Sequence, residues 1–240
     1  MGSDRGGADR RRADGGRPRR STGPGGRTLN ELGELVICGA GGHGAVVGDA
    51  AVSAGFVLVG VIDAVRPVGG GRPPFGGVPW LGSPENPDPS LAELLDRGAL
   101  IHAAIGDAGI RRRWHADHAE HAATIIHPSA TVSPSAEIGV GTFVGPRAVI
   151  NARATIGEGV IVNSGAIVEH DARIGAFTHL APGAIALGNA TIGDAVLLGA
   201  NSTVLPTIRV GDRAMIGAGS VVTHEVAHDV RAFGNPARPR

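Results

Sequence analysis

The chain has no tyrosine, and aromatic residues make up only 3% of its 240 positions. A protein so poor in large rings must build its core from aliphatic side chains. Cysteine is equally scarce: the single Cys38 excludes a disulfide framework and favours a reducing compartment, so we expect a cytoplasmic protein. No apolar run reaches the roughly 18 residues that a membrane span needs, and the N-terminus lacks the apolar segment of a secretory signal. We therefore expect no membrane partner.

The first 30 residues contain almost no aliphatic side chains. Their eight Arg and three Asp give a net charge of +5, whereas the whole chain has a formal charge of zero. Because such a composition cannot bury a core, we interpret residues 1–33 as a disordered basic arm. Contact of the arm with nucleic acid or with a membrane surface is the alternative, although we expect neither partner.

Residues 34–123 have the pattern of a small α/β domain. Apolar runs at 35–38, 56–63 and 100–105 predict buried parallel strands, and 45–54, 91–97 and 110–121 predict helices. Between the first strand and the first helix lies the turn GAGGHG, Gly39 to Gly44, and the second strand ends in Asp63. We interpret this βαβ unit as Rossmann-like.

The glycine-rich turn permits two interpretations. Its glycines and the helix N-terminus behind them can hold a phosphate group. A lone GxGxxG is a weak signal, so a purely structural turn remains the alternative. Binding of NAD is disfavoured, because no second mononucleotide-binding half follows.

Residues 124–240 follow a period of six. Every sixth residue from Ile126 to Val222 is aliphatic, and the residue two positions earlier is mostly Ala, Ser or Thr. A helix would repeat its apolar face every 3.6 residues and a flat strand every two, so this period indicates short strands joined by tight corners, as in a parallel β-helix. Gly recurs one residue after the aliphatic position, and we expect it to turn the corner. At three hexads a coil, which the family resemblance described below implies, the span corresponds to about five coils.

One stretch of the repeat carries the side chains for chemistry. His170 is flanked by Glu169 and Asp171, and a carboxylate beside an imidazole can fix its tautomer and raise its basicity, as a general base requires. His179 also faces outward, nine residues later. Nine residues are half of an 18-residue coil, so the two imidazoles point to different sides and cannot share a site within one chain. Three prisms about a threefold axis would bring one subunit's His170 near a neighbour's His179, which predicts a homotrimer.

The segment NSGAIVEHDARIGAFTHLAPGAIALG, residues 163–188, resembles the bacterial sugar O-acyltransferases of the sialic acid O-acetyltransferase type, within the hexapeptide-repeat acyltransferases. This family includes N-acetyltransferases of UDP-linked 4-amino sugars. The GAGGHG turn, FGGVPWLG from residue 75, AIGD from 104, HPSA from 127 and GNPA from 234 match it in the same order. The resemblance extends from about residue 34 to the C-terminus and implies a left-handed parallel β-helix, mainly β overall, behind the α/β domain.

The resemblance also implies roles for individual residues. It makes His170 the general base, with Asp171 and Glu169 as its carboxylate neighbours. It assigns acetyl-CoA binding to His179, Gly188, Asn235 and Pro236, with the Gly188 N–H facing the thioester carbonyl. It assigns binding of the nucleotide sugar to Gly39, Gly41, Gly42, His43, Gly44, Asp63 and Asn163. Ala64 departs from the family, since relatives often have a second acid there, and Ala108-Gly109 replaces an Asn-containing turn; both leave the nucleotide and the sugar open.

These observations predict an acetyl-CoA-dependent acetyltransferase that acts on an amino or hydroxyl group of a nucleotide-linked or sialic-acid-like sugar, by direct transfer and without a metal. Two alternatives remain. The first is a non-catalytic scaffold or sugar-nucleotide-binding protein. The second is a zinc hydratase on the same fold, which would need three converging histidines. We interpret His115, His118 and His121 as a solvated stripe, and His224 and His228 lack a third ligand.

Overall fold

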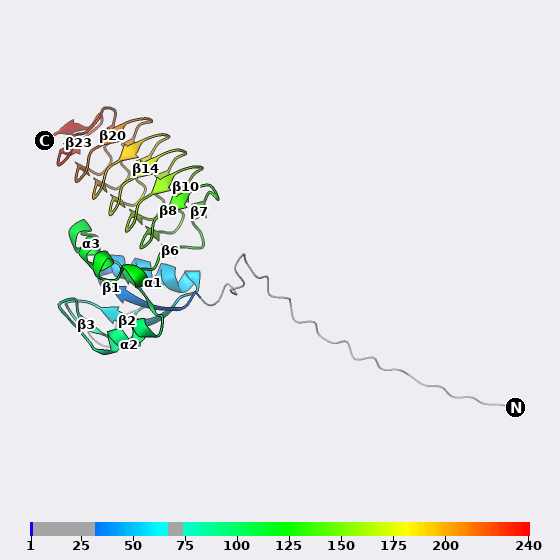
Figure 1. Ribbon diagram of the computed structural model, residues 1–240. Helices are drawn as coiled ribbons and strands as arrows, with labels where there is room; N and C mark the ends of the chain where they lie inside the picture. Colours follow the sequence, from blue (N-terminus) through cyan, green and yellow to red (C-terminus); the bar gives the residue numbers. More distant parts are fainter. Residues whose placement is uncertain (2–31, 67–73) are drawn as a thin grey trace.

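The computed structural model describes Met1, residues 32–66 and residues 74–240. The predicted basic arm lies almost entirely outside the described residues. Figure 1 shows an α/β unit joined to a long stack of coils, with the C-terminus at the far end of the stack. None of the helices that the structure describes has both the length and the apolar character of a membrane-spanning segment.

The α/β unit is built on a three-stranded parallel sheet in the order β2–β1–β5. Its elements are β1 (Glu34–Cys38), α1 (Gly42–Ala54), β2 (Val57–Ile62), β3 (Gly82–Ser83), β4 (Asn86–Pro87), α2 (Ser90–Asp96), β5 (Leu100–Ala103), α3 (Ala108–Asp117) and the 3-10 turn η2 (Ala119–His121). The predicted strands and helices are present with shifted ends. Helix α3 starts earlier than predicted because the Asp107 carboxylate caps it, accepting a hydrogen bond from Ile110 N at 2.8 Å.

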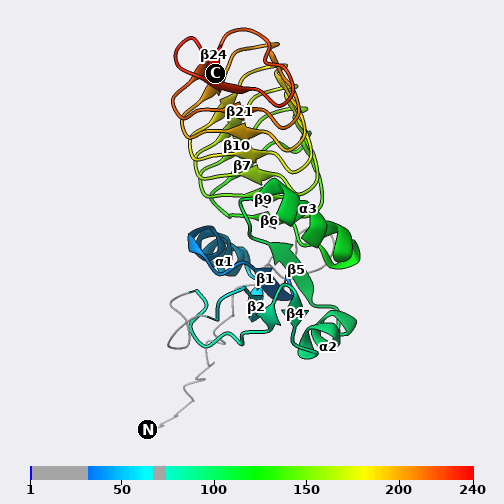
Figure 2. The same cartoon turned by 90° about the vertical axis from the view of Figure 1, so that its left-hand side faces the viewer.

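The hexad repeat forms the predicted parallel β-helix. Each aliphatic position ends a two-residue strand, and each strand pairs in parallel with the strand 18 residues further on, as in Ile150 with Val168. Three sheets result, and Figure 2 shows their strands stacked along the axis of the helix. The first sheet contains β7 (Thr131–Val132), β10 (Val149–Ile150), β13 (Ile167–Val168), β16 (Ile185–Ala186), β19 (Thr203–Val204) and β22 (Val221–Val222). The second contains β8 (Glu137–Ile138), β11 (Thr155–Ile156), β14 (Arg173–Ile174), β17 (Thr191–Ile192) and β20 (Arg209–Val210). The third contains β6 (Ile125–Ile126), β9 (Phe143–Val144), β12 (Ile161–Val162), β15 (His179–Leu180), β18 (Leu197–Leu198), β21 (Met215–Ile216), β23 (Arg231–Phe233) and β24 (Arg238–Pro239).

The core of the β-helix is a column of inward aliphatic side chains. From Val144 to Val222 the residues of the hexad series are buried, and the Ala, Thr and Ser side chains two positions earlier pack beside them. Ile126, which starts the series, is in register with inward Val144 but is 38% exposed, so the expectation of a buried aliphatic residue is wrong there. Its neighbour Ile125 is fully buried instead, because it points out of the coil and under the α/β unit.

The corners of the coils differ from the prediction. The residue with left-handed backbone lies three positions after the aliphatic residue, as at Gly159, Asp171 (φ 59°) and Phe177 (φ 57°), and not one position after it. The recurrent Gly one position after has another cause. A Cβ at Gly157 would come within 2.7 Å of the backbone of the next coil, so glycine there permits close stacking of the coils.

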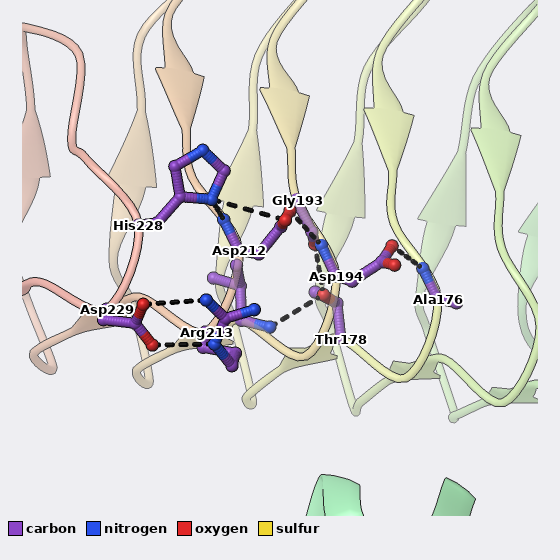
Figure 3. A network of polar contacts seen from close by, with 9 residues as sticks. Ala176, Thr178, Gly193, Asp194, Asp212, Arg213, His228 and Asp229 are labelled. Carbon is purple, nitrogen blue, oxygen red and sulfur yellow. Dashed lines mark hydrogen bonds and ion pairs between the residues drawn. The ribbon is translucent and has the colours of Figure 1, made fainter.

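The C-terminal residues add a coil that the hexad series did not predict. Val226 bridges to Val210, and β23 pairs in parallel with β21, after which β24 turns back on β23. Polar side chains join these last coils along one corner, as Figure 3 shows. Asp194 Oδ1 accepts a hydrogen bond from Ala176 N at 2.8 Å. In the following coils, Asp212 Oδ1 accepts from Asp194 N at 3.0 Å, and His228 Nδ1 accepts from Asp212 N at 3.0 Å.

The α/β unit packs on the third sheet at the start of the β-helix. Ile125, Phe143 and Ile161 point outward from β6, β9 and β12 and are buried in one cluster with residues of α1 and β1. Helix α1 shares this cluster, whereas Trp114 of α3 packs with Val36 and Cys38 on the opposite face of the β2–β1–β5 sheet. The next outward residue of the third sheet, His179, therefore lies at the edge of the α/β unit.

Candidate active site

His170 lies on the corner between β13 and β14 and is 54% exposed. Its Nδ1 is 2.8 Å from Asp171 Oδ2. Because Asp171 has left-handed backbone, its side chain turns back alongside the preceding imidazole. A carboxylate at Nδ1 places a proton on that nitrogen and leaves Nε2 as the basic, outward-facing atom.

Asp171 is itself held by a second partner one coil earlier. Arg153 Nε and Nη2 donate to its two carboxylate oxygens at 2.7 and 2.8 Å. The Arg153 hydrogen bonds, followed by the bond from His170, lower the pKa of the Asp171 carboxyl far below its usual value. Asp171 is therefore ionised throughout the pH range in which a histidine titrates. Glu169 Oε2, in contrast, accepts from the backbone N–H of His170 at 3.3 Å, so of the two carboxylates it is Asp171 that contacts the ring.

Gly188 lies one coil after His170, at the same corner. A Cβ on Gly188 would be 2.8 Å from both Cε1 and Nε2 of His170. Two residues at equivalent corners, Ala152 and Pro206, have a Cβ, so the corner backbone itself tolerates a side chain. Glycine at 188 is thus explained by the imidazole below it. Within the described residues, the Gly188 N–H has no hydrogen-bond acceptor.

His179 points outward from β15 and meets two other predicted site residues. Asn163 Oδ1 accepts from Ser164 N at 2.8 Å, which turns its amide Nδ2 toward His179 Nε2 at 3.2 Å. The ring of His43, from the start of α1, lies 6.1 Å from the His179 ring between centroids. Burial lowers the pKa of both His43 and His179 to about 4. Both rings are neutral at pH 7, and the Asn163 amide directs the His179 proton to Nδ1.

The glycine-rich turn has two distinct sides. His43 faces the β-helix, where its Nε2 is buried without a partner among the described residues. Gly44 is required sterically, since its Cβ would meet Gly39 O at 1.9 Å. Gly41 and Gly42 have open space at their Cβ positions and present the N-terminus of α1. Asp63 supports the turn from below: its Oδ2 accepts from Ala40 N at 2.6 Å.

A cavity of about 460 Å³ opens at the carboxyl ends of β1, β2 and β5. Ligands bind at this edge in many parallel sheets. Gly39 and Asp63, both predicted site residues, line it together with Ile105, Arg113 and Trp114. The sequence did not single out Arg113 and Trp114, because their helix carries three consecutive arginines and its pattern does not indicate which side chains face the cavity.

The prediction of a solvated stripe is wrong for His115, which is buried, whereas His118 and His121 lie after the end of α3 and are half-exposed. His115 is 9% exposed, its Nε2 is 3.2 Å from Glu158 Oε2, and its ring packs against Phe177. His118 stacks on Trp114 with ring centroids 4.7 Å apart. The helix faces the β-helix on this side, which a single-helix pattern could not reveal. In the part of the chain that the structure describes, no group of three His, Cys, Asp or Glu residues is arranged to hold a metal ion.

Asn235 and Pro236 lie in the turn between β23 and β24, at the C-terminal end of the stack, and are exposed. The turn is tied to β22, because Ala237 N donates to Val221 O at 2.8 Å. The outward residues of the third sheet lead from His179 toward this end through Leu197, Met215 and Arg231. The structure therefore brings together His170, Asp171 and Gly188 at one corner, and His43, Asn163 and His179 on another side of the prism.

Comparisons with known proteins agree with this architecture. Residues 34–117 match the PglD N-terminal domain, and residues 189–224 match the bacterial transferase hexapeptide (six repeats). Among curated protein sequences, none matches the chain.

Solved structures match over most of the chain. PerB from Caulobacter crescentus, in complex with CoA and GDP-perosamine, is 34% identical with a TM-score of 0.77, and the match covers 87% of this chain and 98% of PerB. The acetyltransferase domain of PglB from Neisseria gonorrhoeae, in complex with acetyl coenzyme A, is 34% identical with a TM-score of 0.78, over 86% of this chain and 98% of that domain. A histidine-to-asparagine variant of perosamine N-acetyltransferase from C. crescentus, with CoA and GDP-perosamine, matches with a TM-score of 0.78 at 33% identity, over 87% of this chain and 97% of that one. With an α/β unit of the PglD type ahead of hexapeptide coils and relatives at this identity over nearly the full length, the chain belongs to the PglD-type family of hexapeptide sugar acyltransferases.

Proposed function

We propose that this protein transfers the acetyl group of acetyl-CoA to the amino group of a nucleotide-linked amino sugar, with His170 as general base. The observation that carries the proposal is the His170–Asp171 pair, with Gly188 directly above the imidazole. PerB is bound to CoA and GDP-perosamine, which supports acetyl-CoA as the donor and a nucleotide-linked amino sugar as the acceptor class.

The reaction needs no covalent enzyme intermediate. The amine attacks the thioester carbon, a C–N bond forms, and His170 Nε2 takes a proton from the attacking nitrogen. Asp171 stabilises the imidazolium through Nδ1–H. The C–S bond then breaks, and the CoA sulfur receives the proton from His170 and leaves as a thiol. The unpaired N–H of Gly188 is a donor for the oxyanion of the tetrahedral intermediate.

The acceptor's nucleotide fits the cavity at the edge of the β2–β1–β5 sheet. Its walls supply Ile105 and Ile110, apolar side chains for contact with a base, and Arg113, a cation for a phosphate. The N-terminus of α1, at Gly41 and Gly42, adds backbone donors for a diphosphate. Asp63 orders this turn through Ala40 N, so we assign it an orienting role in nucleotide binding.

We further propose that the site is completed in a homotrimer. Outward residues of the first sheet are mostly aliphatic and half-buried, namely Val149, Ile167, Ile185 and Val221. Those of the second sheet are polar or charged and mostly exposed, namely Glu137, Thr155, Arg173, Thr191 and Arg209. An aliphatic sheet face indicates contact with another copy. Because His170 borders the first sheet, this contact would bring it to the neighbour's third-sheet side, where His179 lies.

Acetyl-CoA would then lie between subunits, with its acetyl group at His179 and Gly188. Along the third sheet, Leu197 and Met215 offer an apolar path, and Arg231 ends it near Asn235 and Pro236. A cytoplasmic location is part of the proposal, since the buried, unpaired thiol of Cys38 suits a reducing compartment.

The test is a thiol-release assay with acetyl-CoA against GDP-, UDP- and dTDP-linked 4-amino sugars and sialic acid. We expect CoA release that depends on one of the nucleotide-linked amino sugars, with the product carrying an N-acetyl mass increment. Release of CoA with sialic acid alone would mean that the acceptor is a sialic-acid-like sugar and not a nucleotide-linked amino sugar. Binding of sugar nucleotides without any acetyl transfer would favour the non-catalytic alternative.

A further inference from the structure

Arg111 is a buried cation at the junction of the α/β unit and the β-helix. It is 1% exposed and is the largest side chain in the described residues that is fully buried. Burial lowers the pKa of its guanidinium to about 10, so it remains charged at neutral pH. A buried charge persists only where hydrogen bonds replace its hydration.

Backbone carbonyls from both units provide those bonds. On the β-helix side, Arg111 Nε donates to Gly159 O at 2.7 Å and Nη2 donates to Phe177 O. On the α/β side, Nη1 donates to Ile105 O at 2.7 Å and to Gly106 O at 3.0 Å. The planar guanidinium thus bridges the loop after β5 and the corners of two consecutive coils, which a single ammonium group could not do.

Both ends of this bridge lie beside the proposed site. Ile105 lines the cavity that we assign to the nucleotide, together with Trp114 from the same helix as Arg111. Phe177 is two residues from His179, which faces His43 across the junction. Arg111 therefore links the backbone beside the cavity to the backbone two residues before His179.

We propose that Arg111 is a positioning residue that holds the nucleotide cavity in register with the acetyl site, a role that rests on the proposed function. It touches neither substrate. Its effect is on the placement of the amine of a bound sugar relative to the thioester, for which a displacement of about 1 Å can cost roughly 100-fold in rate.

The test compares Arg111→Lys with Arg112→Lys, a matched control on the same helix whose guanidinium lies over the Phe177 ring in an exposed position. Calorimetry with CoA, and with GDP and UDP, measures binding to each half of the site. We expect Arg111→Lys to bind CoA and the preferred nucleotide within about threefold of the parent, while kcat for the sugar nucleotide falls about 10- to 100-fold. Arg112→Lys should match the parent both in the binding of CoA and nucleotide and in kcat.

Hydrogen exchange gives a readout that does not depend on turnover. Arg111→Lys should speed exchange in residues 105–117 and leave the coils beyond β18 unchanged. Parental kcat together with parental exchange would overturn the proposal, and so would parallel loss of CoA binding, nucleotide binding and rate, which indicates a purely structural role. If the parent acetylates no sugar, the proposed function fails, and exchange at 105–117 still decides whether Arg111 holds the two units together.

Discussion

His170 and Gly188 occupy the same corner of consecutive coils, and their relation can be tested by substitution. In Gly188→Ala the new methyl group would lie 2.8 Å from the imidazole, so the ring must move off Asp171. We expect kcat to fall about 10- to 100-fold with little change in melting temperature, since the ring lies at an exposed corner.

The control for this prediction is the double variant with His170→Ala. Once the imidazole is gone, Gly188→Ala should cost nothing further, because Ala152 and Pro206 show that the corner accepts a side chain. Equal losses from Gly188→Ala in both backgrounds would mean that the glycine acts on something other than His170.

At the residue scale the sequence predicted the contact between His170 and a carboxylate, but not which of two neighbours makes it. Glu169 and Asp171 are equally close in sequence. Asp171 contacts the ring because the left-handed corner falls on it, and the hexad pattern placed that corner two residues too early. Arg153, 18 residues away, gave no signal, because only the stacking of coils brings it to Asp171.

Strand β5 carries a buried histidine that ties stability to pH. His102 Nδ1 is 2.8 Å from Ala123 O, and burial lowers the pKa of the imidazole from about 6.5 to about 4. The unfolded chain therefore binds more protons than the folded chain between these values, and stability must fall as the pH drops from 6.5 toward 4. His43 and His179 act in the same direction.

We expect the melting temperature to decline across this interval, and His102→Asn to make the decline shallower, since an amide can donate to Ala123 O without titrating. The exposed His224→Asn serves as the matched control and should leave the slope unchanged. An identical slope in His102→Asn and in the parent, measured by calorimetry from pH 7 to 4.5, would contradict the assignment.

At the scale of elements, the strands of the β-helix were predictable because each hexad repeats the same local physics. The last coil was not, because residues 223–233 lack the hexad spacing and are held by β21 and by the ladder through Asp212 and His228. The docking side of α3 was equally hidden. It is set by carbonyls at Gly159 and Phe177, far away in sequence.

At the scale of the whole molecule, the proposed homotrimer can be tested on the outward side chains of the β-helix. Ile185→Lys places a charge in the middle of the aliphatic first sheet and should break the trimer into smaller species with little turnover. Thr155→Lys, on the polar second sheet, should remain trimeric and active. Light scattering after gel filtration distinguishes them. A trimeric and active Ile185→Lys protein would show that this sheet is not the subunit contact.

The molecule as a whole could be assigned to its family from motifs. The position of His43 relative to His179 could not be predicted from them. The order of GAGGHG, EHD and GNPA along the chain gives the family, and relatives at 33–34% identity agree with it. The proximity of His43 to His179 follows from the packing of α1 on Phe143, which no local pattern encodes.

The measurement that tests the central claim most directly is the turnover of His170→Ala with acetyl-CoA and the preferred amino-sugar nucleotide, beside calorimetric binding of CoA. If His170 is the general base, kcat of His170→Ala is roughly 10²- to 10⁴-fold lower than that of the parent, while the affinity for CoA is unchanged. The loss of kcat in Asp171→Asn is smaller. If His170→Ala keeps the parental kcat, direct transfer with this histidine as the base is contradicted.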